Sequence, residues 1–122
     1  MKRILIVDDE PGILKVVEFR LKKMGYEVIV AVDGKEGLIR AKEMKPDLVV
    51  LDFRMPFLNG DEVCRQIRED ENIKGIPVIL MTASTQSTTP ENLQNMGATD
   101  HLLKPFDPDD LLGKIRKCLN ES

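Results

Sequence analysis

The sequence predicts an α/β domain in which a five-stranded parallel sheet carries helices on both faces. Short β-branched runs alternate five times with longer segments whose apolar residues recur at intervals of three and four. Two of the short runs, Leu48 to Leu51 and Val78 to Met81, are apolar throughout, which is typical of strands covered by helices on both sides. The predicted fold class is therefore a doubly wound parallel α/β sandwich.

The first part of the chain predicts two strand–helix units. The run Arg3 to Val7 indicates the first strand, and the proline that follows suits the first turn of a helix from Pro11 to Met24. Gly25 ends that helix, and the run Glu27 to Ala31 indicates the second strand. The turn signal Asp33-Gly34 then starts a second helix, from Gly34 to Met44.

The rest of the chain repeats the same pattern three times. Glycines and prolines stand where helices end and strands begin, and prolines again open two of the helices. We expect strands at Asp47 to Leu51, Pro77 to Met81 and Thr99 to Leu103, and helices at Gly60 to Glu69, Pro90 to Met96 and Pro108 to Leu119.

Length and charge limit the possible functions. A typical domain takes about 150 residues, so these 122 residues predict a single domain over residues 1–122. The net charge of −3 argues against a nucleic-acid partner. The longest apolar runs fall far short of the roughly 18 residues of a membrane span, and no signal-peptide core is visible at the N-terminus. We expect a cytoplasmic protein with no membrane partner.

The two cysteines, Cys64 and Cys118, stand alone on amphipathic segments. Their spacing matches neither a metal site nor a redox motif, so we expect reduced structural thiols and no disulfide.

Polar residues follow the predicted strands at their carboxyl ends. In open parallel sheets, ligands bind outside this edge, near the switch in strand order. The residues that leave four of the five strands there are Asp8, Asp9, Asp52, Thr82 and Lys104.

This set of residue types suits phosphoryl chemistry. Clustered carboxylates need a cation, and Mg²⁺ is the usual one where phosphate oxygens are also bound. A lysine and a hydroxyl can neutralise the oxygens of a transferred phosphoryl group, and a carboxylate beside the metal can act as nucleophile. Asp52 is the best nucleophile candidate, because it emerges alone from a buried strand into a turn-rich loop.

At these residues the sequence resembles the receiver domains of two-component response regulators. Each matching segment is a weak signal alone, but the ordered set is specific and extends over essentially the whole chain. The segments are Val7 to Glu10, Leu51 to Pro56 with Asn59-Gly60, Met81 to Ala83, and Gly97 to Phe106.

The resemblance implies a flavodoxin-like fold with strand order 2-1-3-4-5 and a role for each site residue. It implies that Asp52 accepts a phosphoryl group from a histidine kinase or phosphotransferase domain, and that Lys104 and Thr82 contact this group. It implies Mg²⁺, or Mn²⁺ in its place, bound by Asp8, Asp9, Asp52 and the backbone carbonyl of Arg54. It also implies that Thr82 and His101 form the conformational switch, that Lys104-Pro105 is a cis peptide, and that the domain is not an enzyme beyond its own phosphorylation and dephosphorylation.

Other interpretations of these residues stay open. Asp8 and Asp9 could serve only as helix caps, Thr82 as an ordinary strand residue, Lys104 as a surface lysine and His101 as a half-buried strand residue. A phosphohydrolase of the haloacid-dehalogenase type would need an Asp-x-Asp pattern after the first strand, and a flavin carrier would need a neutral phosphate loop there. A degenerate receiver used only for docking is disfavoured by the complete set of site residues.

The first helix predicts a docking surface. On a helical projection Ile13, Leu14, Val17, Leu21 and Met24 share one face, whereas Val16 and Phe19 lie off it. Exposed apolar residues grouped on a helix suit a partner, and in receivers this helix meets the kinase or phosphotransferase. The docking candidates are Val16, Phe19, Arg20, Pro105 and Phe106. The downstream target is not encoded in any motif, and we expect a monomer or weak dimer.

The stretch Ser84 to Thr89 departs from the family pattern. It consists of six polar residues where receivers have usually entered their fourth helix, so we expect a short fourth helix and a mobile segment before it. By the same resemblance, Arg54 and Ser84 occupy variable positions that in receivers influence water access to the acyl phosphate. Neither side chain is suited to orienting water, which predicts slow self-dephosphorylation.

Overall fold

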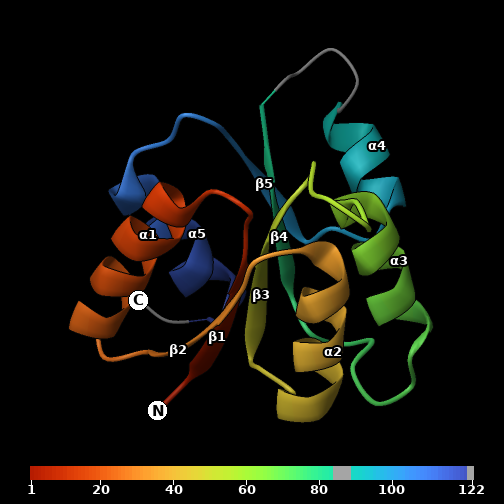
Figure 1. Ribbon diagram of the computed structural model, residues 1–122, viewed down its shortest axis with the longest axis horizontal. Coiled ribbons are helices and arrows are strands. Elements are labelled where there is room, and N and C mark those ends of the chain that lie inside the picture. Colours follow the sequence, from red (N-terminus) through yellow and green to blue (C-terminus); the bar gives the residue numbers. More distant parts are fainter. Residues whose placement is uncertain (84–88, 121–122) are drawn as a thin grey trace.

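The sheet has the predicted topology. The structure is a computed structural model that describes residues 1–83 and 89–120, without the side chains of Pro90 and Leu93. Its five strands are all parallel, in the order β2-β1-β3-β4-β5 (Figure 1). They are β1 (Arg3–Val7), β2 (Glu27–Ala31), β3 (Leu48–Asp52), β4 (Val78–Thr82) and β5 (Asp100–Leu103).

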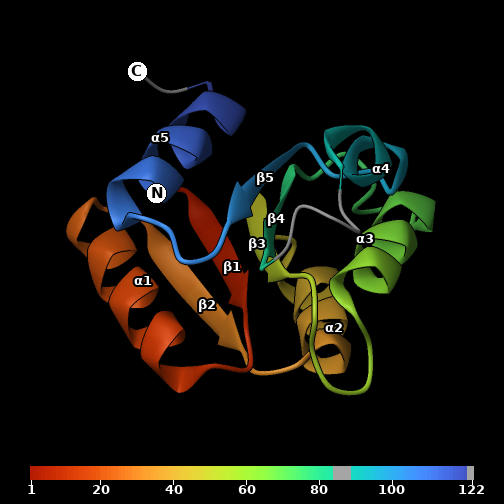
Figure 2. The ribbon, with the colours of Figure 1, turned by 90° about the horizontal axis from the view of Figure 1, so that it is seen from above.

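The helices form two layers around this sheet. Seen from above, α1 and α5 cover one face, and α2, α3 and α4 cover the other (Figure 2). Their bounds are α1 (Pro11–Lys23), α2 (Gly34–Met44), α3 (Gly60–Glu69), α4 (Pro90–Asn95) and α5 (Pro108–Cys118). The doubly wound α/β fold is therefore confirmed.

The alternation of side chains along β1 explains why both layers are needed. Leu5 and Val7 pack into the core beneath α2 and α3, whereas Ile4 and Ile6 pack into the core beneath α1 and α5. All four side chains are fully buried. A strand with two apolar faces is stable only between two helical layers, because each exposed face would leave its apolar area in water.

Two strands extend one residue further than predicted. Asp52 and Thr82 are the last residues of β3 and β4 rather than the residues after them. The backbone pairing explains the difference, because Phe53 N–H donates to the Met81 carbonyl at 2.9 Å and Lys104 N–H donates to the Thr82 carbonyl at 2.6 Å. These two site residues are thus held by the sheet itself.

Helix ends largely follow the predicted signals. The side chains of Asp33 and Thr89 cap their helices, accepting from the N–H groups of Glu36 at 2.7 Å and Asn92 at 3.2 Å. The expectation that Met24 belongs to the buried face of α1 was wrong, since Met24 follows the helix as its C-cap and is 45% exposed. α4 and α5 likewise end one residue earlier than predicted.

Other predictions have mixed outcomes. Both cysteines are free, and the Lys104-Pro105 peptide is cis, as expected. The predicted mobility of Ser84 to Thr89, and the role of Ser84 in water access, concern a stretch of which residues 84–88 lie outside the described part of the chain. Among the described residues, every helix is too short or too polar to span a membrane.

Candidate functional site

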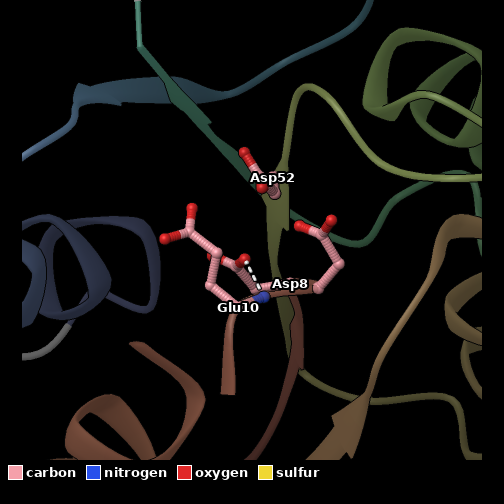
Figure 3. A group of neighbouring side chains, drawn as sticks. Asp8, Glu10 and Asp52 are labelled. Atoms are coloured by element: carbon pink, nitrogen blue, oxygen red, sulfur yellow. Dashed lines mark hydrogen bonds between the residues drawn. The ribbon is translucent and has the colours of Figure 1, made fainter. Parts of the chain in front are cut away.

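The carboxyl edge of the sheet brings the predicted site residues together. Asp52 ends β3, and Asp8 directly follows the neighbouring strand β1. Figure 3 shows Asp52 next to the segment that carries Asp8 and Glu10, and one carboxylate oxygen of each lies within 4.8 Å of the others. Thr82 ends β4, and Lys104 follows β5, so four strands contribute to one group of side chains.

Asp8 is held rigidly at the base of this group. Its backbone N–H donates to the Ala31 carbonyl at 3.2 Å, which continues the pairing of β1 with β2. Its Oδ1 accepts from the Glu10 N–H at 2.9 Å, the dashed line in Figure 3. The side chain is fully buried, so its charge is removed from water and depends on partners within the site.

Lys104 supplies the compensating positive charge. Its Nζ lies 2.9 Å from Asp8 Oδ2, 3.0 Å from Glu10 Oε1 and 3.1 Å from Asp52 Oδ2. The lysine side chain is only 11% exposed. One ammonium group therefore joins three carboxylates at the sheet edge.

The environment of Asp52 favours its protonated form. Burial, followed by the negative charge of Asp8, raises the pKa of Asp52 from 3.8 to about 6, although Lys104 acts in the opposite direction. Burial alone would lower the pKa of Lys104, but its hydrogen bonds to Asp8, Glu10 and Asp52 outweigh burial and raise it. The lysine thus stays charged while the carboxylates still carry an excess of negative charge.

Thr82 presents a buried hydroxyl group at the same edge. The residue is 2% exposed, and its Oγ1 has no hydrogen-bond partner within the described part of the chain. Buried polar groups are nearly always paired, because leaving one unpaired costs free energy. The hydroxyl is therefore available to a ligand bound beside Asp52.

The carboxylates fit a hard divalent cation. Asp8, Asp9, Glu10 and Asp52 each offer an oxygen, and these oxygens lie within 4.8 Å of one another. Asp9 and Arg54 line the same hollow, of about 530 Å³. An all-oxygen ligand set with excess negative charge suits Mg²⁺, which keeps several waters and binds phosphate oxygens.

The loop after Asp52 packs tightly against α3. A Cβ built on Gly60 would lie 2.4 Å from the Asp52 carbonyl oxygen, so only glycine fits there. Gly60 N–H donates to the Phe53 carbonyl at 2.7 Å, and Asn59 Oδ1 accepts from the Met55 N–H at 3.3 Å. These contacts fix the backbone that positions the Asp52 carboxyl group.

The sequence interpretation missed one member of this group. The sequence predicts Glu10 as part of the matching segment Val7 to Glu10 but gives it no role in the site; the structure places it at the N-cap position of α1, without a side-chain capping hydrogen bond. Its carboxylate contacts Lys104 instead. The sequence signal for this contact was the position of Glu10 directly after Asp8 and Asp9. A position next to a helix does not reveal which group a long side chain reaches. Asp33, by contrast, is a cap outside the site, as expected.

The remaining predicted residues lie around the site rather than in it. His101, on β5, is half-buried with its side chain 34% exposed, and its Nδ1 lies 4.0 Å from Asp100 Oδ1. Val16 is 51% exposed and Phe19 is 60% exposed on α1, as the helical projection predicted. A groove of about 460 Å³ lies between α1 and the β5–α5 loop, and its lining includes Ile13, Val16, Pro105 and Phe106.

Fold and site together define a parallel α/β domain whose sheet edge carries a buried set of carboxylates, a lysine and a threonine. The family model for the response regulator receiver domain matches residues 4–116. The chain therefore belongs to the family of response regulator receiver domains. Receiver domains are the phosphoacceptor switches of two-component signalling; they interact with histidine kinases and generally bind Mg²⁺ at an acidic site.

Two solved structures illustrate the similarity. The chemotaxis response regulator CheY4 of Vibrio cholerae has a TM-score of 0.91 and 34% sequence identity, covering 98% of this chain and 99% of that one. The receiver domain of a sensor histidine kinase from Pseudomonas aeruginosa has a TM-score of 0.89 and 32% identity, covering 98% of each chain. That structure has a magnesium ion coordinated in its active-site cleft.

Curated relatives are longer regulators. The DNA-binding dual master transcriptional regulator RpaA of Synechocystis is 40% identical over 100% of this chain and 51% of its own length. The alkaline phosphatase synthesis transcriptional regulatory protein PhoP of Bacillus subtilis is 38% identical over 99% of this chain and 50% of its own. The chain thus spans about half the length of these relatives. RpaA is named as a DNA-binding regulator, so the expectation that nucleic acid is not a partner is not supported.

Proposed function

We propose that Asp52 is the phosphoacceptor and that the chain is a single receiver domain over residues 1–122. A carboxylate oxygen of Asp52 attacks the phosphorus of a phosphohistidine on a kinase or phosphotransferase domain. The new O–P bond forms as the N–P bond breaks, and the electron pair leaves with the imidazole nitrogen. The observation that carries this proposal is the contact of Lys104 Nζ with Asp52 Oδ2 at 3.1 Å, at a buried sheet edge.

The neighbouring residues have distinct tasks in this reaction. Asp8, Asp9, Asp52 and the Arg54 carbonyl would hold Mg²⁺, or Mn²⁺ in its place, and the cation would neutralise charge on the transferred group. Lys104 donates to a phosphoryl oxygen, and the unpaired hydroxyl of Thr82 donates to another. This chain catalyses no reaction besides its own phosphorylation and dephosphorylation, and the Arg54 side chain does not accelerate the latter.

The same contacts would drive the conformational change. Thr82 Oγ1 has no hydrogen-bond partner among the described residues, so a phosphoryl group that accepts from it binds one position of the hydroxyl better than another. Such a difference between two states is what shifts an equilibrium. We assign the rest of the switch to His101, which is half-buried and therefore has room to change its exposure.

The partner that delivers the phosphoryl group would dock on the groove between α1 and the β5–α5 loop. Of the docking residues, Val16, Pro105 and Phe106 line this groove. Phe19 and Arg20 line a second hollow on α1 that shares Val16 with it. Exposed apolar side chains at the mouth of the site support this assignment, because they offer area that a partner helix can bury. The domain would act in the cytoplasm as a monomer or weak dimer, on a downstream target that its relatives' names place in transcription.

Intact mass spectrometry tests the acceptor directly. The protein is incubated with phosphoramidate, a small phosphodonor, with and without Mg²⁺. We expect a Mg²⁺-dependent gain of one phosphoryl group in the wild type and none in Asp52→Ala. Asp47→Asn is the matched control, because Asp47 precedes the same strand at its opposite end and should leave the gain unchanged. No gain in folded wild-type protein would refute the proposal.

Docking needs a separate measurement. Phe19→Ser should leave phosphorylation by phosphoramidate unchanged, since Phe19 lies outside the phosphoryl site. The same variant should slow transfer from a phosphorylated histidine phosphotransferase domain. Equal transfer rates for variant and wild type would remove Phe19 from the docking surface.

A further inference from the structure

Three carboxylate oxygens surround the ammonium group of Lys104 within the described residues. A protonated lysine carries three N–H donors. Its three carboxylate partners, Asp8, Glu10 and Asp52, all lie within 3.1 Å of Nζ. Two of the donors go to Asp8 and Glu10, and the ammonium group also lies against Asp52, so a phosphoryl oxygen on Asp52 competes with these carboxylates for Lys104.

The three partners differ in how easily they can leave. Asp8 is fully buried and is also held by the Glu10 N–H, so its departure would strand a charge away from water. Asp52 is 8% exposed and carries the incoming group itself. The Glu10 side chain is 59% exposed, and within the described residues its carboxylate contacts only Lys104. Glu10 can exchange this contact for water at low cost.

The backbone of Glu10 stays fixed while its side chain is free to turn. Its carbonyl accepts from the Leu14 N–H at 3.1 Å, and its N–H donates to Asp8, so α1 and the β1 end hold it on both sides. Glu10 and Lys104 line the same groove as Pro105 and Phe106. The contact of Glu10 with Lys104 thus lines this groove, next to the ion pair of Lys104 with Asp52.

We propose that Glu10 is a positioning residue that occupies one hydrogen-bond donor of Lys104 until phosphorylation and then yields that donor to a phosphoryl oxygen. This inference rests on the phosphoacceptor role of Asp52. It goes beyond that role because it makes Glu10 a competitor of the phosphoryl group. Any contact that keeps the Glu10 carboxylate on Lys104 weakens the binding of the phosphoryl group.

Three substitutions separate this role from two simpler ones. Glu10→Ala removes both the charge and the contact. Glu10→Asp keeps the charge, but its side chain is one methylene shorter, about 1.5 Å, so it no longer reaches Lys104 and can cap α1 instead. Glu10→Gln loses the charge but keeps an oxygen that can accept from Lys104.

The measurement is the rate of phosphorylation by phosphoramidate with Mg²⁺, together with the affinity for beryllofluoride, a non-reactive phosphoryl analogue. We expect Glu10→Ala and Glu10→Asp to raise both by about three- to tenfold, and Glu10→Gln to raise them less, because a neutral acceptor competes more weakly than a carboxylate. Glu18→Ala is the control: this glutamate pairs with Lys22 on α1, away from the site, and its loss should change neither quantity.

Each rival account predicts a different pattern. If Glu10 only repels phosphate by its charge, Glu10→Gln will match Glu10→Ala while Glu10→Asp stays at the wild-type level. If Glu10 is a metal ligand, Glu10→Ala will weaken Mg²⁺ binding measured by calorimetry. Either result overturns the inference, as does an unchanged rate in all three variants. Absence of phosphorylation in the wild type would instead refute the proposed function.

Discussion

The Nζ atom of Lys104 lies 3.1 Å from Oδ2 of Asp52, yet this contact does not bring the pKa of Asp52 back to its ordinary value. Burial and the fully buried charge of Asp8 prevail, so the pKa of Asp52 stays at about 6. The site is thus built with more negative charge than one lysine can offset. Its unliganded state is consequently less stable than it could be.

Asp52→Asn should therefore stabilise the metal-free protein at neutral pH. The pKa of Asp52 is higher in the folded protein, about 6, than its ordinary value of 3.8, so the folded state binds the proton more tightly. The contribution of Asp52 to stability is complete below pH 3.8 and is lost as the pH rises through about 6. Each pKa unit is worth about 1.4 kcal/mol, and the loss of the Lys104 contact offsets part of it, so we expect a gain of about 1–2 kcal/mol at pH 7.

Urea unfolding in EDTA at pH 4 and pH 7 measures this effect. The advantage of Asp52→Asn should be small at pH 4 and larger at pH 7. Glu43→Gln removes one negative charge from an exposed position of α2 and should show no such difference. Equal gains at both pH values would contradict the prediction.

Thr82→Val should also stabilise the unphosphorylated protein. The substitution replaces a buried hydroxyl that has no partner in the described part of the chain with a methyl group of similar size, which removes a desolvation cost of about 1 kcal/mol. Thr99→Val is the matched control with the opposite sign, because Thr99 Oγ1 accepts from the Val78 N–H at 3.0 Å. In thermal unfolding, the melting temperature of Thr82→Val should be higher than that of the wild type, and the melting temperature of Thr99→Val should be lower. A lower melting temperature for Thr82→Val would show that its hydroxyl is paired.

The predictable part of this site came from backbone topology. The carboxyl ends of parallel strands must meet at one edge, so Asp8, Asp52, Thr82 and Lys104 could be grouped from strand positions alone. The contact of Glu10 with Lys104 could not be predicted, because it depends on the direction of a long side chain rather than on a pattern. The extension of β3 to Asp52 was missed for a related reason: strand ends depend on pairing with the next strand, here through Phe53 and Met81.

Arg68 is a second residue whose importance only the structure reveals. On α3 it donates to the carbonyl oxygens of Gly97 at 2.8 Å, Lys74 at 2.9 Å and Ile76 at 2.6 Å. It thereby joins the loop after α3 to the turn between α4 and β5. Helical periodicity identifies it only as a charged residue on a half-exposed position.

Arg68→Met should destabilise the protein by about 2–3 kcal/mol, because three carbonyl groups lose a charged donor. Arg65→Met is the matched control on the same helix. Arg65 is exposed and, among the residues that the structure describes, pairs only with Glu62 and Glu69 within α3, so its loss should cost about 0.5 kcal/mol or less. Urea unfolding of both variants measures the difference. Equal costs would mean that the bonds of Arg68 contribute no more than surface ion pairs.

The two cysteines should differ in reactivity. Cys64 is fully buried, and burial raises the pKa of its thiol. Cys118 is half-buried, and its thiol pKa is raised by burial and then by Asp100. Because the thiolate is the reactive form, a disulfide reagent should modify Cys118 slowly in the native protein, faster as the pH rises, and Cys64 only on unfolding. Cys118→Ser should leave no reactive thiol in the folded protein, and rapid modification of that variant would contradict the prediction.

The loop between Asp52 and α3 contains a strained residue, Phe57. Its φ of 70° lies in the left-handed region, and Leu58 N–H donates to the Pro56 carbonyl at 2.8 Å across it. A turn of this kind around a positive φ is strained for a residue with a Cβ, whereas glycine adopts it freely. The Phe57 side chain is 85% exposed, so little buried area would be lost on its removal.

Phe57→Gly should therefore stabilise the protein, by about 1 kcal/mol after the greater flexibility of glycine in the unfolded chain is counted. Phe19→Gly makes the same change within α1, at another exposed phenylalanine with ordinary helical backbone, and should destabilise the protein by about 1 kcal/mol. Opposite signs in urea unfolding would assign the gain to backbone strain, because the side chain removed is identical. A loss of stability at both positions would mean that the loop holds Phe57 without strain.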